Sequence, residues 1–123
     1  MNYRKLFVVG TFAALALGQD ASANPAARIQ VSDIKPLLIR AIDQGSAQGV
    51  LVGEAATYVR QKFESPAPIE IDVRTLYALP QPGCSRIEVT TRQKDVLEKA
   101  KRGDKELTYQ VSYCRDGRFP EKR

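Results

Sequence analysis

The chain of 123 residues contains no histidine and no tryptophan, and it has only two cysteines. Without histidine, Ser-His-Asp and Cys-His catalytic arrangements are excluded, together with most transition-metal sites. The glycines between positions 45 and 53 lack the Lys-Ser/Thr ending of a phosphate-binding loop. A folded part of about 100 residues also leaves little room for both a core and a deep cleft. We therefore predict a protein without enzymatic activity, cofactor or bound metal.

One apolar run is present, and it lies at the start of the chain. It extends from Leu6 to Leu17, follows a basic pair at positions 4 and 5, and precedes the small residues of 21–23. A membrane-spanning helix needs about 20 apolar residues, so this run is too short to cross a bilayer. A basic start, a short apolar middle and small residues before a cleavage point are typical of a secretory signal peptide. We therefore predict a cleavable signal peptide over 1–23 and export to the periplasm, with the extracellular medium as the alternative.

The two cysteines, Cys84 and Cys114, are interpreted in the light of export. Paired thiols persist as disulfides in an oxidising compartment. A redox-active pair would normally be a close Cys-x-x-Cys, and a structural zinc site would need more ligands than two thiols. We therefore predict one structural disulfide between Cys84 and Cys114.

The charge is mildly basic, with a formal net charge of +5. Basic residues gather in one stretch of the second half and again in a basic tail over 115–123. Such clusters favour an acidic partner, which could be anionic lipid, polysaccharide, nucleic acid or an acidic protein face. Acidic residues are interleaved with the basic ones, so a solvated loop without a binding role is the alternative. The candidate contacts for an anionic partner are Arg92, Lys94, Lys99, Lys101, Arg102 and Lys105.

Apolar residues at spacings of three and four predict two amphipathic helices after a flexible lead over 24–30. The first is predicted to begin at a cap on Ser32, to end near Gln44, and to carry Pro36 in its first turn. The second is predicted over 50–64. Gly53 lies inside this second pattern and costs about 1 kcal/mol relative to alanine, so either it permits a close approach of the helix or the helix begins later.

Alternation of apolar and polar residues predicts a half-buried strand over 69–75, after the proline-containing segment 65–68. Glu70 and Asp72 share its outer face, where a solvated strand surface is favoured over acid-base chemistry. Two further strands are predicted over 85–92 and 106–114. The charged connection between them is expected to include a helical turn that folds back on the sheet.

The predicted disulfide fixes a register for the last two strands. In an antiparallel pair, setting Cys84 opposite Cys114 determines every other pair by a constant sum of residue numbers. One face of the hairpin then becomes apolar and the other polar, which supports the register. Tyr109 and Tyr113 are thereby expected to face inward. The apolar pairs are Ile87 with Val111, Val89 with Tyr109 and Thr91 with Leu107, and the polar pairs are Arg86 with Ser112, Glu88 with Gln110 and Thr90 with Thr108.

Two helices followed by three strands predict one α+β domain over 31–114, in which the helices pack on the apolar face of a small three-stranded antiparallel sheet. A short connection between the first two of these strands favours a meander. The polar sheet face is expected to meet water or a partner, and an exposed edge strand is able to accept a strand from another chain.

These features predict a small exported, non-enzymatic module of the bacterial cell envelope that binds another envelope protein. The alternatives are a periplasmic inhibitor or immunity-type protein, and a binder of an anionic polymer such as cell-wall material, lipid head groups or DNA. No motif is specific enough to name a family. The layout resembles that of small exported accessory proteins of bacterial secretion and conjugation systems.

Overall fold

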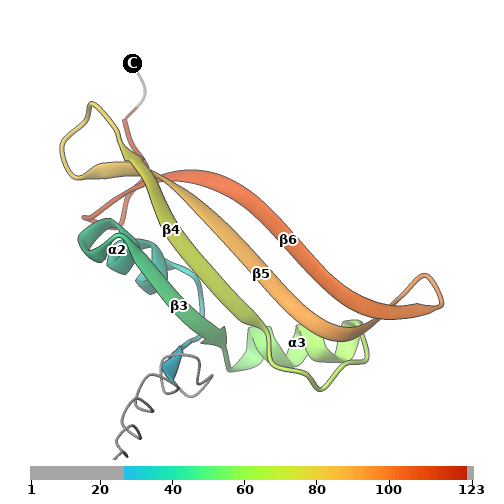
Figure 1. The fold of residues 1–123 in the computed structure, drawn as a ribbon. Helices are drawn as coiled ribbons and strands as arrows, with labels where there is room; N and C mark the ends of the chain where they lie inside the picture. Colours follow the sequence, from blue (N-terminus) through green and yellow to red (C-terminus); the bar gives the residue numbers. More distant parts are fainter. Residues whose placement is uncertain (1–26, 122–123) are drawn as a thin grey trace, which may run out of the picture.

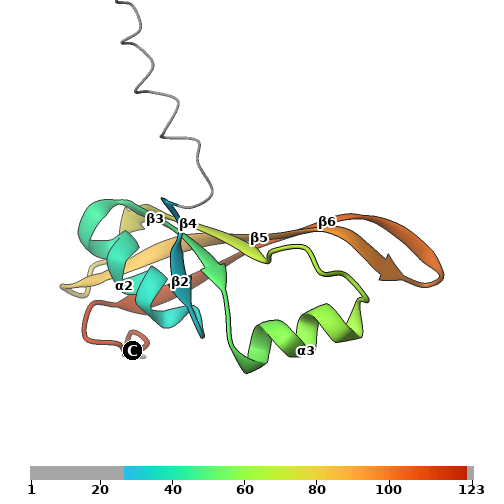
Figure 2. The ribbon, with the colours of Figure 1, turned by 90° about the horizontal axis from the view of Figure 1, so that it is seen from below.

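The computed structural model describes residues 27–121, so the predicted signal peptide lies outside the described residues. Within this range the chain forms an α+β fold, with two helices on one face of a five-stranded mixed sheet (Figures 1 and 2). No helix in this range is long and apolar enough to cross a membrane. The elements are β2 (Ile29–Val31), α2 (Lys35–Gln44), β3 (Ser46–Leu51), α3 (Glu54–Lys62), β4 (Glu70–Ala78), β5 (Cys84–Glu98) and β6 (Lys101–Cys114).

The strands lie side by side in the order in which the chain forms them, from β2 at one edge to β6 at the other. Strands β2 and β3 are parallel and are joined through α2, whereas β3, β4, β5 and β6 are successively antiparallel. The predicted meander of the last three strands is therefore confirmed. The predicted sheet of three antiparallel strands was too small, because it lacked β2 and β3.

Strands β2 and β3 were missed because their segments were predicted to be a flexible lead and the start of a helix. Strand β2 begins at Ile29, inside the expected flexible lead, and β3 covers 50–51, where the second helix was predicted to start. Helix α3 begins at Glu54, directly after Gly53 with a φ of 87°, so the later start is the correct one. Pairing of β3 with β2 on one side and β4 on the other outweighs the helical periodicity at positions 50 and 51.

The start of the first helix also differs from the prediction. Ser32 does not cap it; α2 begins at Lys35, whose N–H donates to the Asp33 carboxylate at 2.8 Å. The reason is that the residues up to Val31 belong to β2, so the chain turns before the helix begins. The helix ends as predicted, near Gln44, with Gly45 in the left-handed conformation at a φ of 95°.

Helix α2 packs on the sheet through the largest group of buried apolar side chains. Leu37 is fully buried and lies against β3 at Gly49, where an added Cβ would stand 2.7 Å from Leu37 Cδ1. Glycine therefore permits the close approach of helix and strand at this point. The buried cluster consists of Val31, Leu37, Leu38, Ala41, Ala47, Ile71, Val73, Ile87, Val89 and Tyr113.

The pairing of β5 with β6 confirms the register derived from the cysteines. Cys84 and Cys114 form the disulfide, and the six pairs predicted above all occur. The two strands continue past their predicted ends to a two-residue turn at Lys99 and Ala100, so the helical turn expected between them was wrong. A bulge at 94–95, with Asp95 at a φ of 53°, shifts the pairing near the middle of this extension.

The distal part of the hairpin, residues 93–105, projects beyond β4 (Figure 1). It is attached to the segment between α3 and β4 instead of to another strand. The Leu97 N–H donates to the Phe63 carbonyl at 2.8 Å, and the Ser65 hydroxyl donates to the Lys94 carbonyl at 2.7 Å. The buried amide of Gln93 donates to two carbonyls of the same segment. These bonds satisfy backbone groups that β4 does not reach, which explains why strand conformation continues here.

Substituting Gly49→Ala tests the helix-strand contact. The new methyl group would overlap Leu37, so we expect the free energy of unfolding to fall by about 1–3 kcal/mol in urea denaturation. Gly103→Ala is the matched control, because an added Cβ at this strand position has no neighbour within 4 Å. Equal stability of the two variants would contradict the described packing.

The hairpin turn provides a second test. Lys99 and Ala100 both have positive φ, at 52° and 66°, which L side chains rarely adopt and which Asn-Gly prefers in such turns. We expect the double substitution Lys99→Asn and Ala100→Gly to raise the free energy of unfolding by about 1 kcal/mol. Lys99→Ala alone, which removes the charge and keeps the backbone strain, should show no comparable gain in the same urea titration.

Candidate functional site

No described element covers the face of the sheet opposite the helices (Figure 2). This face carries polar and charged side chains, among them Asp72, Arg92 and Glu106. A chain of ion pairs crosses it from Arg28, the residue before β2, to β6. Arg28 donates to Asp72 Oδ1 at 2.8 Å and to the Gly49 carbonyl at 3.1 Å. Arg92 donates to the other oxygen of Asp72, and its Nε lies 3.3 Å from Glu106 Oε1. These charged side chains of the solvated face are therefore paired with one another.

The environment of Asp72 sets its protonation. Burial alone would raise the pKa of this carboxyl, but hydrogen bonds from Arg92 and Arg28 and their positive charges lower the pKa below its usual range. The ionised form is therefore the stable one in the folded protein. The carboxylate joins β4 to Arg28 at one side and to β5 at the other, and this is a structural role.

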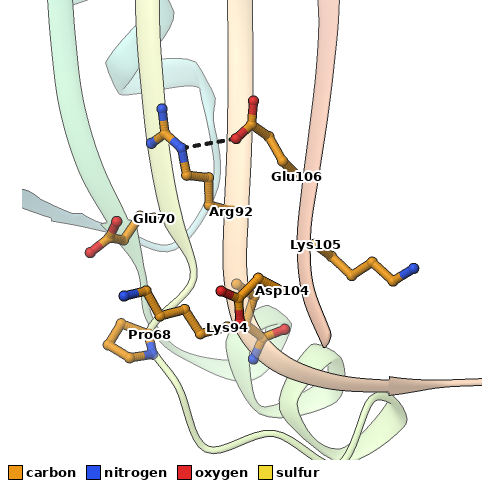
Figure 3. A pocket seen from close by; sticks show the side chains of 8 residues that line it. Pro68, Glu70, Arg92, Lys94, Asp104, Lys105 and Glu106 are labelled. Carbon is orange, nitrogen blue, oxygen red and sulfur yellow. Dashed lines mark hydrogen bonds and ion pairs between the residues drawn. The ribbon is translucent and has the colours of Figure 1, made fainter. Parts of the chain in front are cut away.

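The structure does not gather the six basic candidates into one patch. Arg92 lies on the polar face between Asp72 and Glu106, Lys105 points away from this group (Figure 3), and the remaining members lie further along the hairpin. Lys105 pairs with Glu98 at 2.9 Å, and Arg102 lies 3.6 Å from Asp95. Within residues 27–121, three of the six make no ion pair, and these are Lys94, Lys99 and Lys101.

The most open element is β6, the last strand of the sheet. Within the described residues no further strand pairs with it, and ten consecutive residues, 101–110, are exposed. We call its unpaired side the open edge. The strand divides into two parts of different character. A charged half, Lys101–Glu106, has only one uncharged residue, whereas an uncharged half, Leu107–Cys114, has no charged residue at all.

The backbone groups that face the open edge follow from the hydrogen bonds at the disulfide. The Cys84 N–H donates to Gln81, its carbonyl accepts from Leu79, and the Cys114 N–H donates to the Arg118 carbonyl. The pair Cys84 and Cys114 is therefore a non-hydrogen-bonded pair of the ladder. Because the two kinds of pair alternate, the even-numbered residues of this part of β6 direct their N–H and C=O groups away from β5. They are Glu106, Thr108, Gln110 and Ser112.

An apolar groove of about 390 Å³ lies beside the open edge, between α3 and the hairpin on the helix side of the sheet. Leu107 stands at its margin with 63% of its surface exposed. Tyr109, two residues further on the same face, is 42% exposed, so the prediction that it faces inward was wrong, whereas Tyr113 is buried as predicted. The apolar residues that line this groove are Val59, Phe63, Ile69, Val96 and Leu107.

The exposed state of these side chains could not be predicted from alternation. Leu107 and Tyr109 continue the apolar face of β6, which predicts burial. Helix α2 covers that face at the disulfide end, and α3 lies toward the hairpin end, beside β5 and below the sheet (Figure 2). The helices therefore leave the margin of the apolar face uncovered along the middle of β6. Partial burial of Tyr109 still raises the pKa of its phenol, which remains neutral at physiological pH.

The role of Asp72 is tested by its pH dependence. Its pKa is lower in the folded than in the unfolded chain, so its contribution to stability is present above about pH 4 and is lost as the pH falls below this value. We expect Asp72→Asn to lower the free energy of unfolding at pH 7 by about 1–2 kcal/mol. The difference from the unmodified protein should shrink in acid, whereas Glu121→Gln, at an exposed carboxylate, should match the unmodified protein throughout.

The described part of the chain has no cluster of metal-ligating side chains beside these surfaces. Residues 27–121 contain no group of three or more His, Cys, Asp or Glu side chains that could hold a metal ion. No family model, curated protein or solved structure matches the chain. The candidate site is therefore the open edge of β6 together with the adjoining apolar groove.

Proposed function

We propose that this protein is a small exported accessory module of the bacterial cell envelope, without enzymatic activity, that binds another envelope protein by β-strand addition. The observation that carries the proposal is the uncharged half of β6 with its outward-facing backbone groups. A strand that pairs with this edge gains main-chain hydrogen bonds from the outward-facing residues up to Ser112, since the Cys114 N–H already donates to the Arg118 carbonyl. The length of β6, 14 residues, provides room for such a partner strand.

The side chains beside the edge define the chemistry of the partner. In an added strand, every second side chain points to the helix side of the sheet and meets Leu107, Tyr109 and the apolar groove. The intervening side chains point to the polar face, beside Glu106 and Thr108. The partner segment is therefore an extended one, with apolar residues at alternate positions and polar residues between them.

The two edges of the sheet differ in a way that supports this assignment. Natural proteins protect sheet edges by short strands and charged side chains. Strand β2, at the opposite edge, has only three residues, and the charged half of β6 is protected by its charges. The uncharged half carries neither protection, which is expected of a segment that is covered by a partner.

The export part of the proposal rests on the sequence of 1–23 and on the disulfide. A disulfide between Cys84 and Cys114 persists in an oxidising compartment such as the periplasm. Service to a secretion or conjugation system is one setting in which a small exported adaptor of this kind would act.

An inhibitor or immunity-type protein would use the same edge, and it would differ by suppressing the rate of its target enzyme. Binding of an anionic polymer would instead depend on the basic stretch and would weaken steeply with salt. Three of the six basic residues there are engaged by acidic neighbours, which favours the protein partner over the polymer.

Strand addition is tested by removing one outward-facing N–H. We expect Thr108→Pro to abolish partner binding, because proline cannot donate this bond and its ring occupies the open edge. Thr108→Ala is the matched control, since it removes the hydroxyl contact with Thr90 and keeps the N–H. The readout is a photo-reactive amino acid placed at Tyr109 in the exported protein, with Tyr77, exposed on β4, as the control position.

The expected result is one defined protein cross-linked from position 109 and not from position 77. This adduct should persist with Thr108→Ala and disappear with Thr108→Pro, while both variants keep their far-ultraviolet circular dichroism and their disulfide. An adduct that survives the proline substitution would contradict strand addition. Loss of binding with salt alone would favour the anionic polymer.

A further inference from the structure

We infer that a second copy of this chain occupies the open edge when no other partner is bound. The two β6 strands would pair antiparallel about a two-fold axis at Thr108 and join the two sheets into one. The inference rests on the proposed function in one respect, since both assign binding to the open edge. It differs in its partner, which is the chain itself.

The outward-facing backbone groups of Glu106, Thr108 and Gln110 permit this pairing around the axis. A two-fold axis perpendicular to the sheet places residues opposite each other when their numbers add to a constant, and it keeps each side chain on its own face. With the axis at Thr108, this residue lies opposite itself and Glu106 lies opposite Gln110 of the second copy. All of these residues direct their N–H and C=O groups to the open edge, so the inter-chain ladder forms complete hydrogen-bonded pairs.

Charge excludes the registers that are centred in the charged half. An axis at Lys105 would place this residue opposite itself and Asp104 opposite Glu106. An axis at Glu106 would place two glutamates opposite each other. Like charges directly opposite one another destabilise a strand pair. With the axis at Thr108, the charged half of each strand lies opposite the uncharged half of the other, and no like charges meet.

Apolar contact selects the axis at Thr108 among those that remain. An axis at Leu107 would place Tyr109 opposite Lys105, and an axis at Tyr109 would place Leu107 opposite Val111. Only the axis at Thr108 places the two exposed apolar side chains, Leu107 and Tyr109, opposite each other, and symmetry produces this contact twice. Both lie on the helix side, where the two apolar grooves would then meet across the new interface.

Self-pairing has a consequence for the accessory role. It covers the unprotected half of β6 and prevents uncontrolled edge pairing while the protein is free in the envelope. A partner strand would have to displace the second copy, so only a segment that pairs better than β6 itself would be bound. Dimerisation would in this way set the threshold for partner binding.

The test is the oligomeric state of the purified exported protein, measured by sedimentation velocity over a wide range of concentrations. We expect a dimer for the unmodified chain. Leu107→Lys and Tyr109→Glu should each weaken the dimer about tenfold or more, because each disrupts both copies of the apolar contact. The double variant should recover dimerisation, since the two introduced charges are opposite in sign and then lie opposite each other across the two copies. Tyr77→Lys, at an exposed site on β4 that β5 separates from β6, should leave the dimer unchanged.

Three outcomes overturn the inference: a monomer at every concentration, a dimer that tolerates both single substitutions, or a double variant that stays monomeric. The last outcome is expected for an axis at Leu107 or at Tyr109, because the charge introduced at the axis would then face its own copy. A monomer that still cross-links one different protein from position 109 would overturn self-pairing and leave the proposed function standing. A dimer that cross-links no different protein from position 109 would support self-pairing and overturn the proposed function.

Discussion

The interaction on which the rest of the structure depends is the long antiparallel pairing of β5 with β6. It begins at the pair formed by Cys84 and Cys114 and continues to the turn at 99–100. Every other strand is added to this hairpin from one side only, through β4, then β3, then β2. The other side of the hairpin is thereby left as an edge. The same ladder that holds the sheet together therefore produces its one long exposed strand.

The disulfide matters in this arrangement because of where it lies in the ladder. It cross-links two residues that are 30 positions apart and fixes the register at the end of the hairpin next to α2. In the chain-entropy model, closing a loop of this size stabilises the folded state by roughly 3–4 kcal/mol. The cross-link also determines which backbone groups of β6 face outward, because the alternation of pair types is counted from this point. The disulfide at one end of the ladder thus determines which backbone groups face the open edge as far away as Glu106.

Much of this hairpin could be predicted from the sequence, because two independent signals agree on it. The cysteines gave one pairing, and alternation of apolar and polar residues gave the same pairing between Ile87 and Val111 and their neighbours. Strands β2 and β3 had no such second signal. They are short, and their conformation depends on neighbours far along the chain, so local periodicity at 50–51 pointed to a helix instead. At Gly49 the deciding fact is the contact with Leu37, which becomes visible only in three dimensions.

The extension of the hairpin was missed for a related physical reason. Val96 and Leu97 fit a helical turn when they are viewed alone, but the Leu97 N–H donates to the Phe63 carbonyl at the end of α3, and Val96 is buried. Tertiary hydrogen bonds from the segment 63–67 replace those of a neighbouring strand and hold 93–98 extended. For the candidate site, alternation correctly placed Leu107 and Tyr109 on the apolar face, but it could not show that this face extends further than the helices that cover it.

The apolar face of β6 extends further than the helices that cover it, and our proposal depends on this difference. Helices α2 and α3 are short, with ten and nine residues, and they lie below different parts of the sheet, whereas β6 has 14 residues (Figure 2). A third covering element, or a further strand, would complete the layer. The described chain provides neither beside Leu107 and Tyr109, while it protects the remainder of its edges with charge and with a three-residue strand. This incomplete place, on a chain whose other edges are protected, is the reason why our proposal assigns the partner strand to β6.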